Sequence, residues 1–317
     1  MIATIIGALL PIVVTLILGF VAGWHHDFDG KQATILNRMV MLYALPLSLF
    51  AGMVGTARDE VLSQGVLALA ILVGMAGGYA VVFLICRYVF RRDMMTASLQ
   101  ALAVAGPAVP FVGVSVLGHL FGTASAIPIS VASLVMNLIQ VPATLLLLSA
   151  GQAQRPQSQM GARSAPPSLG HHIVHALREP VVWAPLLALL LVIFNLHFPA
   201  AIQDSLTLLG RATGGVALFA SGIVLYSRKV ALNTAVAVSV FAKNILIPAV
   251  MWGLMLAAGL APALNREVVL TLAIPTASIA VILAVQYETA EQEIASTLFF
   301  STILSVVTMG GFIWLTA

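Results

Sequence analysis

The stretch A-V-A-G-P-A-V-P-F-V-G at residues 103–113 holds two prolines and two glycines in a segment that is otherwise apolar enough to cross a membrane. Proline removes a backbone donor and clashes with the preceding helical turn, and glycine adopts conformations that other residues avoid. A helix that crosses a membrane here is therefore interrupted. Because lipid offers no partner to free backbone groups, such a break is tolerated only where it is buried in protein or lines a cavity.

The composition is that of an integral membrane protein. Of the 317 residues, 61% are hydrophobic and 8% are charged, and the mean hydropathy is +1.07. Apolar windows long enough to span a bilayer occur at residues 3–24, 36–56, 65–90, 96–118, 126–150, 180–198, 205–227, 232–259, 267–286 and 294–316. The net charge of +3 comes from cations between these windows, without the basic, aromatic-rich clusters of nucleic-acid-binding proteins. The single cysteine, Cys86, excludes a disulfide framework.

One long polar connector, residues 151–178, divides the chain into a first half (1–150) and a second half (179–317) of five windows each. With the amino terminus outside, only two loop cations, Arg58 and Arg266, lie outside. The other ten lie in the cytoplasm, namely Lys31, Arg38, Arg87, Arg91, Arg92, Arg155, Arg163, Arg178, Arg228 and Lys229. The positive-inside rule therefore predicts both termini on the outer side of the membrane and the connector in the cytoplasm. Because five spans is an odd number, the second half is inverted relative to the first.

The two halves also resemble each other in sequence. L-S-L-F-A-G-M-V at 47–54 resembles V-A-L-F-A-S-G-I-V at 216–224, and A-V-A-G-P-A at 103–108 resembles T-L-A-I-P-T-A at 271–277, so that Pro107 corresponds to Pro275. The expected fold is all-α, with ten transmembrane helices in two inverted five-helix repeats and with broken, crossing helices 4 and 9. Matching breaks in inverted halves indicate the substrate site of a transporter, and the half-helix that begins after each break favours an anion.

Ionisable residues inside the spans give a further indication of the charge of the substrate. All eleven carboxylates lie at or beyond span ends, whereas Lys243 lies deep in the eighth window, in F-A-K-N-I-L-I-P. An interior with a central lysine and no carboxylate suits an organic anion, and buried charges in membranes are functional by default. Lys243 has a second interpretation, as a structural lysine bonded to carbonyls freed by Pro248. Arg211 is shallower and can extend to the interface.

The remaining polar candidates are buried amides and hydroxyls. Asn137 and Gln140 lie one helical turn apart in the fifth window. Either can bind a carboxylate or join helices, and joining is favoured for Gln140. The expected substrate-binding residues are Gly106, Pro107, Ala108, Pro110, Asn137, Lys243, Asn244, Pro275, Thr276 and Ser278. No catalytic residue, metal or cofactor is expected, and His171, His172 and His175, which lack an acidic or cysteine partner, are interpreted as a solvated loop.

The order of these motifs resembles the auxin efflux carrier family, which includes the plant PIN-type auxin exporters and bacterial malonate-transporter-like permeases. The resemblance rests on the ten windows, L-P-L-S-L-F at 45–50, the proline breaks and K-N-I-L-I-P at 243–248. It implies an elevator-type carrier in which spans 1, 2, 6 and 7 form a scaffold, and spans 3–5 and 8–10 a transport domain. It also implies a homodimer built from scaffold helices.

The chain lacks the long hydrophilic middle loop and asparagine-rich fourth span of many plant members, so it is most similar to the bacterial branch, which moves malonate or another small carboxylate. Two alternatives are a sodium-coupled bile-acid-type anion symporter and an exporter of auxin-like aromatic carboxylates. The symporter would need acidic sodium ligands near the crossing. A hydrolase would need a nucleophile with a nearby base inside the membrane, and a sensor would need a soluble output domain; neither is evident.

Overall fold

The computed structural model describes residues 2–55, 58–59, 64–153, 180–196, 199–227 and 230–316. Within these residues every regular element is helical, and the one β-type contact is an isolated bridge between Pro107 and Thr276. The elements of the first half are α1 (Ile2–Trp24), α2 (Gly30–Met39), η1 (Val40–Ala44), α3 (Leu45–Val54), α5 (Gly65–Leu72), η2 (Val73–Gly77), α6 (Gly78–Leu84), η3 (Ile85–Val89), α7 (Met94–Ala105), η4 (Val109–Gly113), α8 (Val114–Phe121), η5 (Gly122–Ser125), α9 (Ala126–Val135), η6 (Met136–Gln140) and α10 (Val141–Ala153).

The elements of the second half are α12 (Pro180–Ile193), α13 (Ala200–Gly210), α14 (Ala212–Ser227), α15 (Thr234–Phe241), η8 (Ala242–Leu246), α16 (Ile247–Ala257), α17 (Pro262–Ala273), α18 (Ile279–Gln286) and α19 (Glu291–Leu315). Nearly all of the polar connector expected at 151–178 lies outside the described residues, as do His171, His172 and His175; its first three residues belong to α10.

The all-helical, multi-pass character expected from the composition is confirmed. Six helices of the described residues are long and apolar enough to cross a membrane, and shorter apolar helices accompany them at Val13–Trp24 and Met94–Ala105. Many large apolar side chains on their outer faces are exposed, among them Leu69, Val81 and Leu254. Such a surface suits contact with lipid tails, which are as apolar as leucine.

Polar caps determine where several helices begin. Asp29 and Gln32 form a reciprocal capping box, so α2 starts at Gly30, six residues before the apolar window predicts. Asp93 accepts hydrogen bonds from the backbone of Met95 and Thr96 at the start of α7. Burial of the Asp93 carboxyl opposes its ionisation, but the hydrogen bonds, led by those from Thr96, outweigh burial and lower its pKa below the ordinary value.

Short π-helical turns interrupt several of the helices. In η1, η6 and η8 the turn precedes a proline by two residues, at Pro46, Pro142 and Pro248. A proline cannot donate to the carbonyl four residues before it. A π turn shifts the hydrogen bonds by one residue and so accommodates the missing donor inside a continuous helix.

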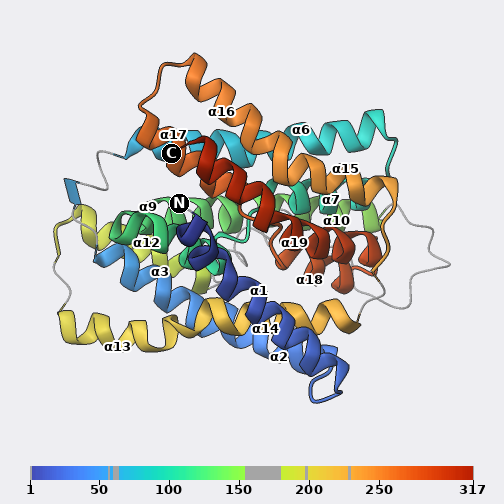
Figure 1. Ribbon diagram of the computed structural model, residues 1–317, viewed down its shortest axis with the longest axis horizontal. Helices are drawn as coiled ribbons and strands as arrows, with labels where there is room; N and C mark the ends of the chain where they lie inside the picture. Colours follow the sequence, from blue (N-terminus) through green and yellow to red (C-terminus); the bar gives the residue numbers. More distant parts are fainter. Residues whose placement is uncertain are drawn as a thin grey trace.

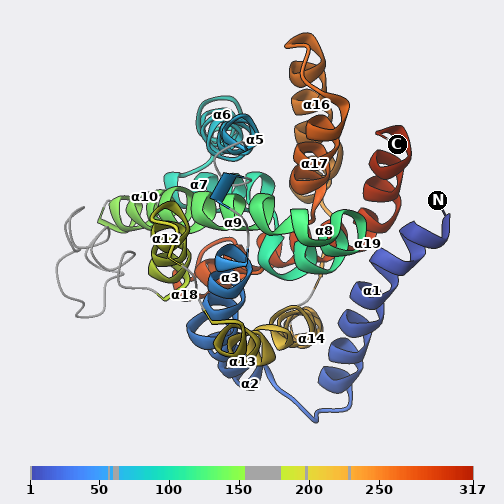
Figure 2. The ribbon, with the colours of Figure 1, turned by 90° about the vertical axis from the view of Figure 1, so that its left-hand side faces the viewer.

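The helices form layers (Figures 1 and 2). Along the bottom of both views lie α2, α13 and α14, while α6 and α16 lie at the top and α7, α9, α10 and α19 lie between them. A close helix crossing joins α1 to α14. A Cβ on Gly19 would lie 2.0 Å from the Phe219 carbonyl oxygen, and one on Gly222 would lie 2.2 Å from the Leu16 carbonyl oxygen. Only glycine permits this approach, as at many membrane helix crossings.

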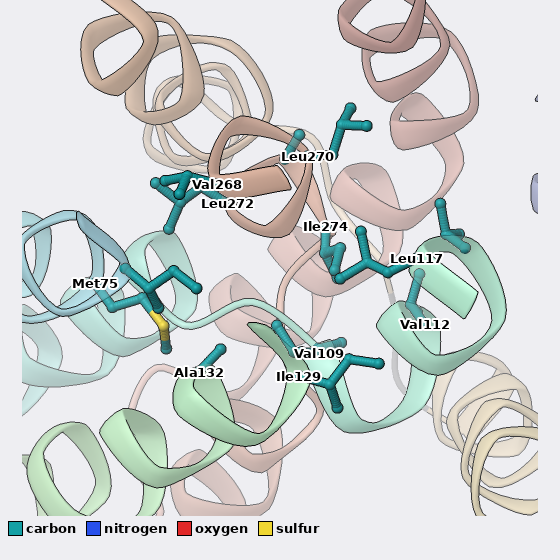
Figure 3. Packing of buried hydrophobic residues seen from close by; sticks show 14 of the residues in the cluster. Met75, Val109, Val112, Leu117, Ile129, Ala132, Val268, Leu270, Leu272 and Ile274 are labelled. Carbon is teal, nitrogen blue, oxygen red and sulfur yellow. The ribbon is translucent and has the colours of Figure 1, made fainter. Parts of the chain in front are cut away.

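The largest hydrophobic core surrounds the two interrupted helices. Met75 from η2, Val109 and Val112 from η4, and Leu272 and Ile274 beside the second break pack into one cluster (Figure 3). Leu117 of α8 and Ile129 and Ala132 of α9 belong to the same cluster. The irregular backbone is therefore enclosed by apolar side chains, as expected for a break at membrane depth.

Candidate functional site

The two interrupted helices meet at their breaks. Helix α7 ends at Ala105 and helical structure resumes at Val109, while α17 ends at Ala273 and α18 begins at Ile279. The unwound segments pair antiparallel. Ala108 N donates to Pro275 O at 2.8 Å, and Ala277 N donates to Gly106 O at 3.0 Å. The expected crossing of the two breaks is therefore present.

Side chains from other segments donate hydrogen bonds to the backbone carbonyls that the first break leaves without a helical donor. The carbonyl of Ala103 would normally accept from the residue four positions on, which is Pro107 and has no N–H. The Thr276 hydroxyl donates to it instead, at 2.8 Å. The carbonyl of Ala105 accepts from Gln140 Nε2 at 3.0 Å, and the same amide nitrogen donates to Met75 O at 2.9 Å. The interpretation of Gln140 as a residue that joins helices is therefore confirmed.

At the second break, Lys243 donates a hydrogen bond to a backbone carbonyl that has lost its helical donor. The Thr276 N–H, which would normally bond to Leu272 O, donates to the Ser301 hydroxyl at 3.1 Å. Lys243 Nζ donates to the freed Leu272 carbonyl at 3.0 Å, and the lysine is fully buried. The alternative that Lys243 bonds to carbonyls freed by Pro248 is wrong, because the acceptor lies on another helix. Next to it, the Asn244 amide donates to Ser301 O and accepts from Ser301 Oγ.

A small cavity of about 20 Å³ adjoins the crossing. Such a volume holds about one water molecule. Four hydroxyl-bearing residues and six apolar ones line it, namely Thr276, Ser278, Ser221, Thr302, Leu16, Ala108, Val112, Ala217, Leu218 and Leu298. The hydroxyls of Ser221 and Thr302 donate to carbonyls of their own helices. Ser278 stands at the amino end of α18, and its side chain makes no capping hydrogen bond there.

The ten predicted residues fall into three groups. Ala108, Thr276 and Ser278 line the cavity. Gly106, Pro107 and Pro275 form the bridge, and Lys243 and Asn244 support it from behind. The other two belong to neither group: the Asn137 amide donates to Ser133 O of its own helix, and Pro110 lies in η4 with its side chain outside the described part. Whether any of the ten binds substrate stays a prediction.

Sequence reasoning missed the cavity residues that come from α1, α14 and α19. Ser221 lies inside the V-A-L-F-A-S-G-I-V segment, whose resemblance to the first half was noted in the sequence, so a signal for it existed. Leu16 and Thr302 carry no such signal, because ordinary apolar and hydroxyl residues recur along every span. Among the described residues, no group of three or more His, Cys, Asp or Glu side chains is placed to hold a metal ion.

A second, larger cavity of about 720 Å³ opens near the start of α2. Its lining comes from α2, from α14 and from α18, namely Asp29, Gly30, Lys31, Thr34, Asn37, Val224, Val281, Ile282, Val285 and Gln286. Both cavities use the same faces of two helices. Residues 217, 221 and 224 recur at helical spacing along α14, as do residues 278, 281, 282, 285 and 286 at and beyond the start of α18. The two cavities therefore lie along the same faces of α14 and α18.

Comparison with known families assigns this sequence to a family. A family model described as "Membrane transport protein" matches residues 4–313. The chain belongs to this membrane transport protein family. The resemblance to the auxin efflux carrier family and its malonate-transporter-like permeases is thereby confirmed. This membership assigns the chain to a family of transporters.

Two relatives from this transport protein family span almost the same length. The "Uncharacterized transporter YfdV" of Escherichia coli (strain K12) is 32% identical over 316 residues, covering 97% of this chain and 96% of the relative. The "Putative malonate transporter" of Rhizobium meliloti (strain 1021) is 23% identical over 315 residues, covering 99% and 96%. The similarity thus extends over both breaks and over all of the helices that surround the two cavities.

Proposed function

We propose that this protein is a secondary transporter that moves a small organic anion, a malonate-like mono- or dicarboxylate, across the bacterial inner membrane. The observation that carries the proposal is the cavity beside the crossing of two unwound helices. In transporters, broken helices place their ends at the substrate site. The name of the Rhizobium relative, a "Putative malonate transporter", supports malonate-like substrates.

The chemistry of the crossing favours an anion. The cavity lining contains four hydroxyl-bearing residues and no charged side chain. Helix α18 begins at this point, and the free N–H groups and dipole of a helix amino terminus attract negative charge. Ser278 adds a hydroxyl that does not cap the helix. At about 20 Å³ the cavity is too small for malonate, so the site is closed here and substrate binding requires the surrounding helices to separate.

Elevator-type alternating access accounts for the location of this cavity. We assign the helices of spans 1, 2, 6 and 7 to a scaffold and those of spans 3–5 and 8–10 to a transport domain. Packing supports the grouping: α1 packs on α14, and α3 on α12 and α13, whereas α7 packs on α6 and α10, and α17 and α18 on α19. The cavity lies between the groups, with α1 and α14 on one side and the crossing on the other.

The larger cavity supplies the access route in this proposal. Lys31 and Asp29 line this cavity with one charge of each sign, and the buried amide of Asn37 adds a polar group to the lining. We place the opening of this cavity in the cytoplasm and both termini in the periplasm, in agreement with the bias of loop cations. Two inverted five-helix repeats (1–150 and 179–317, joined by 151–178) complete the proposed architecture, and the antiparallel pairing of the breaks supports their inversion.

Transport assays in proteoliposomes test the function. Purified protein should take up labelled malonate or a related carboxylate, without requiring sodium. Ser278→Ala should weaken uptake, because it removes a hydroxyl from the cavity. Ser205→Ala is the matched control: it removes an exposed hydroxyl of α13 and should leave uptake unchanged. Strict dependence on sodium would favour the bile-acid-type symporter, and transport of aromatic carboxylates alone would favour the auxin-like exporter.

Oligomeric state forms a separate part of the proposal. The family resemblance implies a homodimer through the scaffold helices, and two-fold pairing is the commonest oligomeric arrangement. The mass of the active, detergent-purified protein measures this directly. A monomeric mass with full activity would remove the dimer from the proposal and leave the transport mechanism as it stands.

A further inference from the structure

Resting on the proposed function, we propose that the Lys243 ammonium is a fixed positive charge that travels with the crossing. It balances one negative charge of the substrate in place of a coupled cation. The step that carries a bound monocarboxylate across the membrane field then moves no net charge.

The first support is the isolation of this cation. Lys243 is fully buried, and its ammonium donates to one backbone carbonyl, that of Leu272. Among the described residues no carboxylate forms an ion pair with Lys243; an ion pair between Arg92 and Glu293 lies elsewhere, at the ends of α7 and α19. A buried charge at membrane depth without a counter-ion indicates a functional role, and an anion bound in the cavity beside the crossing would supply the missing charge.

The second support is that Lys243 is attached to the crossing. The turn η8 packs against α7, α17 and α19, so it contacts both interrupted helices. Its acceptor, Leu272, precedes the cavity residue Thr276 by four positions. The neighbouring Asn244 bonds to Ser301, whose hydroxyl accepts from the Thr276 backbone. Any movement that carries the crossing therefore carries the lysine with it.

The charge of each moving state follows. We count the net charge of Lys243 together with the bound substrate in the moving transport domain. It is one positive charge in the empty domain, zero with a bound monocarboxylate and one negative charge with a bound dicarboxylate. A charge that crosses the whole field changes the ratio of inward to outward states about 50-fold per 100 mV. The voltage dependence of substrate exchange, in which only the loaded domain crosses, therefore reports the charge that the protein contributes.

The test compares two substrates that differ by one charge. Full-length protein is reconstituted in vesicles, and counterflow of labelled monomethyl malonate or malonate is measured at about pH 8, where their carboxyl groups are ionised. A potassium gradient with valinomycin sets the potential to zero or to about 100 mV of either sign. With the wild type, exchange of the monoester should change less than about 2-fold with potential, whereas exchange of malonate should change several-fold.

Variants locate the charge. In Lys243→Gln, exchange of the monoester should become dependent on voltage, because the loaded domain now carries one negative charge. Lys243→Arg keeps the charge and should keep the wild-type insensitivity, even if exchange is slower. Arg211→Gln is the matched control, since it removes an exposed cation at the junction of α13 and α14, outside the proposed transport domain.

Each outcome decides the inference. Monoester exchange that depends on voltage in the wild type as strongly as in Lys243→Gln would overturn it, and the same result in Arg211→Gln would overturn the location of the charge. If Lys243→Gln does not fold, the comparison of the two substrates with the wild type still tests the inference. Wild-type exchange that depends on voltage for both monomethyl malonate and malonate would overturn it. Absence of any carboxylate exchange at every potential would instead refute the proposed function, and this inference with it.

Discussion

Thr276→Val tests whether one hydroxyl holds the two breaks together. Valine has nearly the same shape as threonine, so the substitution removes a hydrogen bond without creating a cavity. Thr276 Oγ1 and the Ala103 carbonyl oxygen lie 2.8 Å apart, and both residues are almost completely buried. Because Pro107 supplies no N–H to this carbonyl, the variant leaves a buried acceptor unpaired. The expected cost is about 1–3 kcal/mol, or about a 5- to 150-fold lower ratio of folded to unfolded protein.

Thr302→Val is the matched control on the same cavity. The hydroxyl of Thr302 donates to Leu298 O at 2.7 Å. That carbonyl lies inside the continuous helix α19, so it keeps its backbone donor when the hydroxyl is removed. The expected loss is therefore near the lower limit for a hydrogen bond, about 0.5 kcal/mol. Both residues line the cavity, so each variant loses one cavity hydroxyl. Thr276→Val in addition removes the hydrogen bond to the Ala103 carbonyl, so comparing the two variants isolates the effect of that bond.

Thermal unfolding of the purified variants in detergent measures the difference. Thr276→Val should unfold at a clearly lower temperature than Thr302→Val, which should remain close to the wild type. Counterflow per folded molecule, measured on the same samples, separates a loss of stability from a loss of binding. Equal unfolding temperatures for the two variants would refute the reasoning, because the Ala103 carbonyl would then have another donor.

Three further predictions concern packing, capping and orientation. Gly222→Ala should lower the unfolding temperature, because its Cβ would lie 2.2 Å from a backbone oxygen of α1, whereas Gly215→Ala meets no atom within 4 Å and should gain up to about 1 kcal/mol of helix propensity. Asp93→Ala should cost about 1 kcal/mol at neutral pH by removing the cap of α7. Because folding lowers the pKa of Asp93, this contribution is fully present above the unfolded pKa of about 3.9, and the difference from the wild type should vanish as pH falls through the folded pKa. In a background without the native cysteine, Thr123→Cys should react with an impermeant thiol reagent added to intact cells and Gln286→Cys only after permeabilisation; the reverse pattern would invert the proposed orientation.

Features with a local cause could be predicted from the sequence. The apolar windows follow from the length that a bilayer requires, and each of them contains helix in the described structure. The interruptions at Pro107 and Pro275 follow from a missing donor and a steric clash, which no tertiary contact removes. Lys243 could be singled out because a deep cation among apolar residues is costly wherever it points.

Features that depend on which helices become neighbours could not be predicted. The acceptor of Lys243 is the Leu272 carbonyl, and the donor to Ala103 is Thr276; both pairs join distant segments and exist only once the breaks cross. Leu16 and Thr302 reach the cavity through the packing of α1 and α19. The early start of α2 was missed for another reason: a capping box extends a helix into polar sequence that a hydropathy window ignores.

The bridge between Pro107 and Thr276 has a consequence for biosynthesis. The ribosome delivers the first break about 170 residues before the second, which at 5–20 residues per second takes roughly 10–30 s. During that time the carbonyl of Ala103 has neither a helical donor nor the hydroxyl that later serves it. The nascent first half must therefore wait beside the translocon, or in contact with water or a chaperone, until its partner segment emerges. A chain truncated before Pro275 would keep this unpaired carbonyl permanently, at a cost of about 1–3 kcal/mol to the stability of the first half.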